Sequence, residues 1–149
     1  MRVSALMTTP PVVVAPRTAA RQAALRMDDE AVGCLLVAEG EHLCGILTDR
    51  DLAILTLGRG LAPDTPVSEF MSTPVVTLDV ADDLETAYRL FRRSGLRRLP
   101  VLDGERPVGL LAVDDLFRDV LQRLADLLGP ISWSVLRDDH PGPVEQPAE

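Results

Sequence analysis

Residues 3–14 read VSALMTTPPVVV, and residues 67–78 read VSEFMSTPVVTL, which is the same pattern 64 positions later. The match continues without a gap, so that residues 3–52 align with residues 67–116. Fifteen of the 50 aligned pairs are identical, whereas average composition would give roughly three. Identical residues at matched points of two long segments indicate an internal repeat.

The length of each copy suggests how the copies are arranged. We assign residues 1–62 to repeat 1 and residues 63–122 to repeat 2, with a linker at 58–66. A unit of about 60 residues buries too little surface to be comfortable alone, so we expect the repeats to pack on each other. Residues 123–149 are assigned to the end of a helix and a proline-rich tail that is predicted to be disordered. Trp133, the only tryptophan, has no predicted role.

Each repeat predicts the element order β-α-β-β-α, and hence an α+β fold of two tandem copies. The β-branched runs at 12–14 and 75–78 follow proline and predict the first strand of each repeat. Thr18 is the expected cap of the next helix in repeat 1. In repeat 2, Asp82 and Glu85 have the spacing of a capping box.

Two hairpins and two further helices complete the prediction. The apolar runs that pair are 34–38 with 43–47, and 98–102 with 108–111. The helices are expected to begin at Thr48 and Asp49, and at Asp114 and Asp115, because acidic residues are favoured in a first turn. The apolar period beyond residue 116 predicts an amphipathic helix.

The two cysteines fall on adjacent strands of the first predicted hairpin. A turn centred near Gly40 places Cys44 opposite Leu36 and Cys34 opposite Ile46. The thiols are then diagonal, which is a poor geometry for a disulfide. We expect buried free thiols that act as small hydrophobic groups.

Composition narrows the classes of function. Apolar residues make up 46% of the 149 residues and charged residues 26%, so the chain can bury a core. The formal charge of −8 disfavours nucleic acid and anionic membrane as partners, because both attract a basic surface. No apolar run approaches the roughly 18 residues of a membrane span, and the first residues lack the apolar core of a secretory signal. The expected location is the cytoplasm.

The sequence contains no motif of a known catalytic or metal site. GxSxG, Walker and HExxH patterns are lacking, and no Cys/His pair has the arrangement of a nucleophile and its base. His42 and His140 have no partner at metal-ligand spacing. We therefore expect neither catalysis nor a bound metal.

The order Val-x-x-x-Met-x-x-Pro, strand, helix, hairpin and Gly-x-x-Thr-x-x-Asp-Leu resembles the cystathionine-β-synthase (CBS) domain. Besides the two opening stretches, it is carried by CGILTDRDLAILTLGRGLAPDTP in repeat 1 and by RRLPVLDGERPVGLL and AVDDL in repeat 2. The chain is similar to the small stand-alone bacterial CBS-pair proteins, or Bateman modules, over residues 1–120. The resemblance implies pseudo-two-fold symmetry and a homodimer formed through exposed helices at 49–57 and 116–128.

The resemblance also implies a ligand, which is AMP, ADP, ATP, S-adenosylmethionine or NAD(H) in a cleft between the repeats, with no required cofactor. Asp51 stands where the family places the aspartate that accepts both ribose hydroxyls. Thr48 offers a hydroxyl, and backbone N–H groups at the helix start suit a phosphate. Ile46 and Val12 are expected to enclose the purine. The alternative is that Thr48 and Asp51 only cap a helix.

The corresponding residues Asp115, Leu110 and Val76 are further candidates for nucleotide binding. Repeat 2 departs from the pattern, because Ala112 stands in place of the threonine and Asp114 in place of an arginine. A hydroxyl is lost, and the added carboxylate would repel phosphate if it faced the ligand. We therefore expect two unequal clefts, and the one at the aspartate of repeat 1 is the better site.

Arg97 and Arg98 occupy the place where a pair of basic residues contacts phosphate in some nucleotide-binding relatives. Guanidinium groups suit phosphate oxygens because they form two parallel hydrogen bonds. Repeat 1 has Gly33 and Cys34 at these positions and supplies no such charge. The alternative is that both arginines lie on a solvated surface and make weak ion pairs.

Two hypotheses follow for the function. In the first, the chain is a non-catalytic sensor that binds an adenosyl ligand and passes the signal to an unidentified regulated protein. In the second, it is an interaction or dimerisation module with no physiological small ligand. The second is favoured by Ala112, Asp114 and the uncharged pair Gly33 and Cys34.

Overall fold

The computed structural model of this chain describes the backbone of residues 1–138 and the side chains of residues 1–130. The chain forms two units, residues 1–113 and residues 114–149. Both predicted repeats contribute a sheet to the first unit. The side chain of Trp133, His140 and the predicted disordered tail beyond Asp138 lie outside the described residues.

Each repeat has the predicted order β-α-β-β-α. Repeat 1 consists of β1 (Val13–Val14), α1 (Ala20–Glu30), β2 (Cys34–Glu39), β3 (His42–Thr48), α2 (Asp49–Leu52) and the π-helical continuation η2 (Ala53–Gly58). Repeat 2 consists of β4 (Leu78–Asp79), α3 (Leu84–Ser94), β5 (Arg98–Asp103), β6 (Arg106–Ala112) and α4 (Val113–Asp138). Single turns of 3-10 helix, η1 (Val3–Ala5) and η3 (Val67–Glu69), precede them.

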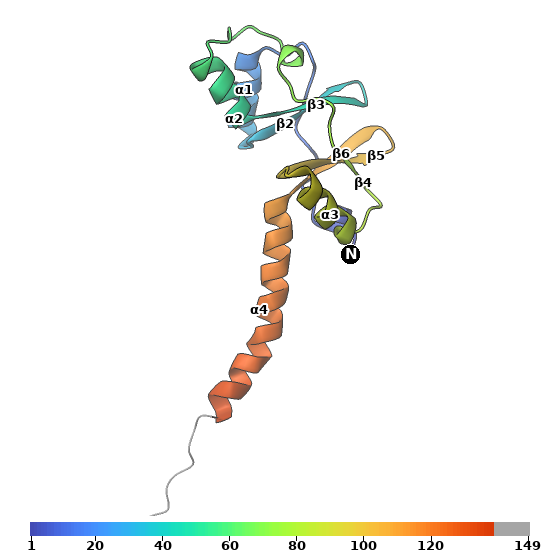
Figure 1. Cartoon of the computed structure of the whole chain (residues 1–149), viewed down its shortest axis with the longest axis vertical. Helices are drawn as coiled ribbons and strands as arrows, with labels where there is room; N and C mark the ends of the chain where they lie inside the picture. Colours follow the sequence, from blue (N-terminus) through green and yellow to red (C-terminus); the bar gives the residue numbers. More distant parts are fainter. Residues whose placement is uncertain (139–149) are drawn as a thin grey trace, which may run out of the picture. The chain divides into compact units, whose positions relative to one another are not determined.

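Two three-stranded sheets form the centre of the first unit. In each sheet the short first strand pairs in parallel with the second, and the second and third form an antiparallel hairpin. The two hairpins lie next to each other, with α1 and α2 beyond one sheet and α3 beyond the other (Figure 1). The predicted α+β fold with two tandem repeats is confirmed.

The repeats exchange their leading segments, by which we mean the residues that precede the first strand of each repeat. Val67 of repeat 2 is fully buried in the apolar core of repeat 1, and its N–H donates to the carbonyl of Thr18 at 2.8 Å. Val3 of repeat 1 is also fully buried, and its N–H donates to the carbonyl of Asp82 at 2.9 Å. Each repeat is therefore packed against a segment of the other repeat.

A methionine from each leading segment lies over a glycine of the other repeat. A Cβ atom added at Gly45 would lie 2.4 Å from the sulfur of Met71, and one added at Gly109 would lie 2.4 Å from the sulfur of Met7. Real carbon and sulfur atoms do not approach so closely, so any larger residue at these two positions would require the methionine side chain to move. This packing explains why both glycines recur at the same point of the repeat.

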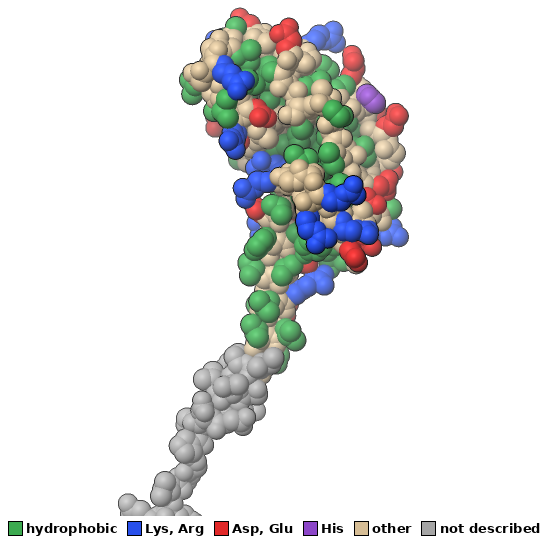
Figure 2. Space-filling view, viewed as in Figure 1, with side chains coloured by type: hydrophobic (Ala, Val, Ile, Leu, Met, Phe, Trp, Pro, Cys, Tyr) green, Lys and Arg blue, Asp and Glu red, His purple; other side chains and the backbone are tan. Residues whose placement is uncertain are grey.

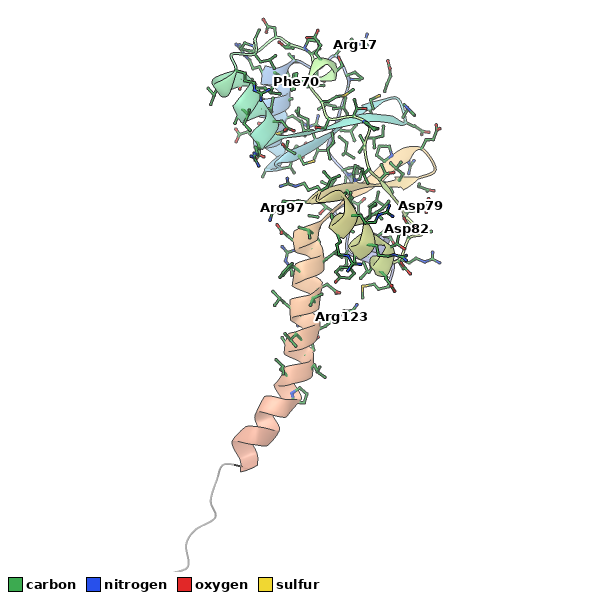
Figure 3. The ribbon with its side chains drawn as sticks, in the orientation of Figure 1. Arg17, Phe70, Asp79, Asp82, Arg97 and Arg123 are labelled. Atoms are coloured by element: carbon green, nitrogen blue, oxygen red, sulfur yellow. The ribbon has the colours of Figure 1, made fainter. Side chains whose placement is uncertain are left out.

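The predicted helix caps were wrong by one residue in both repeats. Ala19 precedes α1 as its cap residue, and its N–H donates to the side chain of Gln22 at 3.3 Å. In repeat 2 the cap is Asp83, which accepts from the N–H of Thr86 at 2.8 Å. Asp82 instead accepts from the N–H of Asp79 at 2.8 Å and holds the turn before α3 (Figure 3).

The predicted strand at 75–78 was also too long, because only Leu78–Asp79 forms β4. In repeat 1 the N–H of Leu36 donates to the carbonyl of Val12 at 3.0 Å and so extends the pairing of β1. The equivalent residue in repeat 2 is Pro100, which has no N–H to donate to Val76. The ladder therefore begins later in repeat 2.

The predicted register of the first hairpin was wrong by two residues. Cys34 pairs with Thr48, and Leu36 pairs with Ile46. Part of the error is that Glu39 pairs with His42, so the turn is centred after Gly40, and a bulge near Val37 adds the rest. Both cysteines are free, as predicted, but only Cys34 is buried, whereas Cys44 is half-buried.

α4 presents two different faces. Its polar face is held by pairs within the helix, such as Arg123 with Asp119 at 2.9 Å and Gln122 with Asp126 at 2.9 Å. Six of its apolar side chains are exposed and gather along the helix (Figure 2): Phe117, Val120, Leu121, Leu124, Leu127 and Leu128. No helix among the described residues combines the length and the apolar character needed to cross a membrane.

Candidate functional site

A cavity of about 360 Å³ lies at the start of α2 and is named the first cavity here. Repeat 1 lines it with Ile46, Thr48, Asp49, Arg50 and Asp51. Repeat 2 lines it with Ser72, Pro74, Val75, Val76, Gly95, Leu96, Arg97 and Arg98. A volume of this size falls within the range of small-molecule sites, and the apolar wall with a few polar groups is their usual composition.

The first cavity brings together six of the nine predicted binding residues. They are Ile46, Thr48, Asp51, Val76, Arg97 and Arg98. Val12, which was expected to enclose the purine, does not line the first cavity and packs against the core of repeat 1. The exchanged leading segments explain the difference: β3 pairs with Ser72 of repeat 2, so Val76 takes the position expected for Val12.

Leu110 and Asp115 are not part of the first cavity. The N–H and carbonyl of Leu110 exchange hydrogen bonds with Thr8 at 3.0 and 2.8 Å. Asp115 belongs to the second unit, where one of its carboxylate oxygens lies 3.6 Å from the guanidinium of Arg118. Both residues were expected in a second, weaker cleft.

Thr48 and Asp51 form a capping box at the start of α2. The hydroxyl of Thr48 accepts from the N–H of Asp51 at 3.2 Å, and the Oδ2 atom of Asp51 accepts from the N–H of Thr48 at 3.1 Å. The two side chains therefore do cap the helix. A carboxylate has about four acceptor positions, so the box fixes Asp51 while leaving acceptor capacity toward the cavity.

The backbone N–H groups at this helix start, which were expected to suit a phosphate, already have acceptors within the chain. The N–H of Asp49 donates to the carbonyl of Gly33 at 3.0 Å, and that of Arg50 donates to the side chain of Asp49 at 2.8 Å. The third N–H, that of Asp51, is used by the cap. At this helix start, an anion would have to be bound by side chains.

Three arginines supply that charge. Arg50, Arg97 and Arg98 line the cavity and are exposed, and Arg97 projects where α3 leads into β5 (Figure 3). Within residues 1–130, no carboxylate lies within 4.0 Å of their guanidinium groups. The prediction missed Arg50, although its position two residues after Thr48 in a helical turn was a usable signal.

Cys34 lies beside the first cavity but is not reactive. Burial raises the pKa of its thiol to about 11, which the charge of Arg98 partly offsets and the charges of Asp49 and Asp51 reinforce. At neutral pH the group is therefore a protonated thiol, and nucleophilic chemistry requires the thiolate.

A second cavity, of about 480 Å³, lies near the hairpin turns and was not predicted. It is lined by His42, Leu43, Cys44, Thr73, Pro74, Val75, Thr77, Leu102, Gly104 and Glu105. The Nδ1 atom of His42 lies 4.0 Å from the carboxylate of Glu105. No arginine lines this cavity. Among the described residues, no cluster of histidine, cysteine and acidic side chains is suited to hold a metal.

Comparisons with known proteins agree on one family. The CBS domain model matches residues 3–57 and 67–122. CBS domain-containing protein YhcV of Bacillus subtilis is 41% identical over 110 residues, which cover 74% of this chain and 79% of that protein. The crystal structure of the CBS domain NE2398 is 31% identical, with a TM-score of 0.73, and covers 81% of this chain and 98% of that chain. The crystal structure of CBSX2 in complex with AMP is 27% identical, with a TM-score of 0.68, and covers 81% of this chain and 96% of that one.

Proposed function

Since this chain belongs to the CBS domain family and carries the domain twice, we propose that it is a regulatory module whose first cavity binds an adenine nucleotide or another adenosyl ligand. The observation that carries the proposal is the meeting of Asp51 with three arginines in one cavity. A carboxylate and guanidinium groups are the side chains that recognise a ribose diol and a phosphate.

Each part of the ligand has a counterpart in the first cavity. The ribose hydroxyls donate to the carboxylate of Asp51, which the capping box holds in one orientation. The purine lies between Ile46 and Val76, and phosphate oxygens accept from Arg97, Arg98 and Arg50. The complex of CBSX2 with AMP supports this class of ligand. ADP, ATP, S-adenosylmethionine and NAD(H) are the alternative ligands.

The module acts without catalysis in this proposal. Ligand binding changes the affinity for a regulated protein, and this requires that the ligand bind one conformation better than the other. We place it in the cytoplasm as a homodimer. Exposed apolar residues at Ile54 and Leu57 of η2, and along α4, favour self-association, because large exposed apolar faces usually mark interfaces.

The second candidate function is an interaction module without a small ligand. The uncovered apolar face of α4 favours it, as does the absence of Thr48 and Arg50 equivalents in repeat 2.

Thermal unfolding distinguishes the two candidates. The protein is melted alone and with millimolar AMP, ADP, ATP, S-adenosylmethionine or NADH. A ligand at 100 times its dissociation constant adds about 2.7 kcal/mol to the free energy of unfolding. At least one ligand should raise the melting temperature of the native chain and fail to do so in Asp51→Ala. No shift with any of the five would leave the interaction module as the better account.

A further inference from the structure

Residues 73–77 separate the two cavities. Ser72 and Val76 line only the first cavity, Thr73 and Thr77 line only the second, and the intervening Pro74 and Val75 line both. This alternation is expected of an extended segment with one cavity on each side. The 73–77 segment is therefore a shared wall, and any displacement of it enlarges one cavity and reduces the other.

The 73–77 segment is held only at its ends. Before it, Ser72 exchanges two backbone hydrogen bonds with Ile46, at 2.9 and 3.2 Å. After it, Leu78 begins β4. Within the described part of the chain, no backbone hydrogen bond is made to residues 73–77. Segments without such bonds are the ones that move at the least cost in free energy.

The equivalent segment of repeat 1, residues 9–13, is fastened at two points. The hydroxyl of Thr9 donates to the carbonyl of Val108 at 2.9 Å, and the N–H of Leu36 donates to the carbonyl of Val12 at 3.0 Å. Repeat 2 lacks the second bond because Pro100 stands in place of Leu36 and has no N–H. Pro100 thus accounts for one of the two hydrogen bonds by which the segments differ.

We propose that the 73–77 segment is a movable partition, through which occupation of the first cavity narrows the second. This inference rests on the proposed function of the first cavity. A ligand there contacts Pro74, Val75 and Val76, and the cheapest response is a shift of the unfastened backbone toward the second cavity. The ligand binds the shifted state better, which is the condition for a change in population.

A shift of the 73–77 segment would change the shape of the second cavity. This cavity opens between the turn of the β2–β3 hairpin, at His42, and the turn of the β5–β6 hairpin, at Glu105. These turns are exposed, so the signal reaches a surface that a regulated protein can contact. A wall displaced by occupancy would link the adenosyl site to that surface.

The thiol of Cys44 reports on the second cavity. Cys44 lines that cavity and is half-buried, whereas Cys34 is buried with a pKa of about 11 and stays unreactive. The rate of Cys44 alkylation by iodoacetamide is measured by mass spectrometry. A protease that cleaves after glutamate separates the two cysteines at Glu39 and Glu41. The rate is compared with and without AMP, with binding followed by melting temperature.

Three variants test the wall itself. Val76→Trp fills the first cavity without any nucleotide, and Val76→Phe replaces it if the tryptophan variant does not fold. Pro100→Ala and Pro100→Leu each restore an N–H that can donate to the carbonyl of Val76. Alanine reduces and leucine increases the volume at this buried position, so an effect common to both arises from the N–H group. Pro100 lines neither cavity.

We expect AMP to slow Cys44 alkylation about threefold or more in the native chain, because the narrowed cavity limits access of the reagent. Val76→Trp should slow it similarly without AMP. In Pro100→Ala and Pro100→Leu, the slowing of alkylation by AMP should fall by at least half, while AMP still raises their melting temperature. The slowing by Val76→Trp should fall by at least half when this substitution is combined with either Pro100 variant. An unchanged rate in AMP-bound native protein, or in folded Val76→Trp, would overturn the proposal, and so would undiminished effects in both Pro100 variants. If AMP causes no melting shift, AMP binding fails, and the Val76→Trp comparison alone decides the partition.

Discussion

Repeat 1 and repeat 2 build the same sheet but equip it differently at the start of the last helix. Repeat 1 has Thr48 and Arg50 there, and repeat 2 has Ala112 and Asp114. A cap hydroxyl and a positive charge in one copy therefore correspond to a methyl group and a negative charge in the other. The glycine, the aspartate and the final leucine of the motif are common to both copies, whereas the threonine is not.

At the start of the hairpin, repeat 2 carries the positive charge and repeat 1 does not. Repeat 2 has Arg97 and Arg98, and repeat 1 has Gly33 and Cys34. Because the repeats exchange their leading segments, the first cavity takes its capping box from repeat 1 and two arginines from repeat 2. The comparison teaches that the fold is symmetric in its core, whereas the residues suited to a nucleotide are concentrated in one cavity.

The symmetry of the core predicts the largest effects. Leu47 and Leu111 occupy the same position of the repeat and are both fully buried. Replacement of either by alanine should lower the free energy of unfolding by about 2–5 kcal/mol, from lost burial and the remaining void. Urea unfolding monitored by circular dichroism gives both values. A cost below about 1 kcal/mol for one of them would show that the two cores are not equivalent.

The asymmetry of the site predicts a large difference between the two aspartates. Asp51→Ala should weaken AMP binding by about 10- to 100-fold, which corresponds to about 1.5–3 kcal/mol for hydrogen bonds to a charged group. Asp115→Ala is the matched control and should have a smaller effect in titration calorimetry. Asp51→Asn keeps an acceptor for the cap and separates lost stability from lost binding. A greater loss in Asp115→Ala would reverse the assignment of the better cleft.

The arginines of repeat 2 predict a smaller and salt-dependent effect. Arg98→Ala should weaken AMP binding by about fivefold or less near physiological salt, because exposed charges are screened. The loss should increase when the salt concentration is lowered, and adenosine binding should not change. Titrations of AMP and adenosine at two salt concentrations measure this. Equal losses for both ligands would exclude a phosphate contact.

The smallest difference concerns the caps of α1 and α3. Hydrogen bonds from the side chain and the N–H of Thr86 hold the pKa of Asp83 below its usual 3.8, whereas the equivalent cap, Ala19, does not titrate. A lowered pKa contributes stability that is present above the usual value and is lost as the pH falls through the folded value. Asp83→Asn should therefore destabilise the protein at neutral pH and lose this effect in acid. Urea unfolding at both pH values tests it, and an equal destabilisation in acid would contradict the assignment.

The repeat made most of the fold predictable. Matched residues identify two copies, and glycine turns between apolar runs locate both hairpins. The errors arise where one backbone group decides the outcome. Pro100 shortens β4 by removing a donor, and a bulge near Val37 shifts the register of the first hairpin. Neither effect changes the hydrophobic pattern from which the elements were predicted.

The polar residues of the candidate site could be predicted from the sequence, but the segments that enclose the cavity could not. Asp51, Thr48 and Arg98 follow from a motif in the sequence, and all three line the first cavity. Val12 does not, because the exchange of leading segments depends on contacts between residues far apart in the chain. The same exchange brings Val76 and Ser72 into the cavity. The second cavity has no sequence motif at all, since its lining comes from three separate segments.

Titration calorimetry with AMP tests most directly whether the duplicated fold carries a single working site. The account predicts one equivalent of AMP bound per chain and a loss of that binding in Asp51→Ala. Two equivalents per chain, or one equivalent that Asp51→Ala leaves intact, would contradict it.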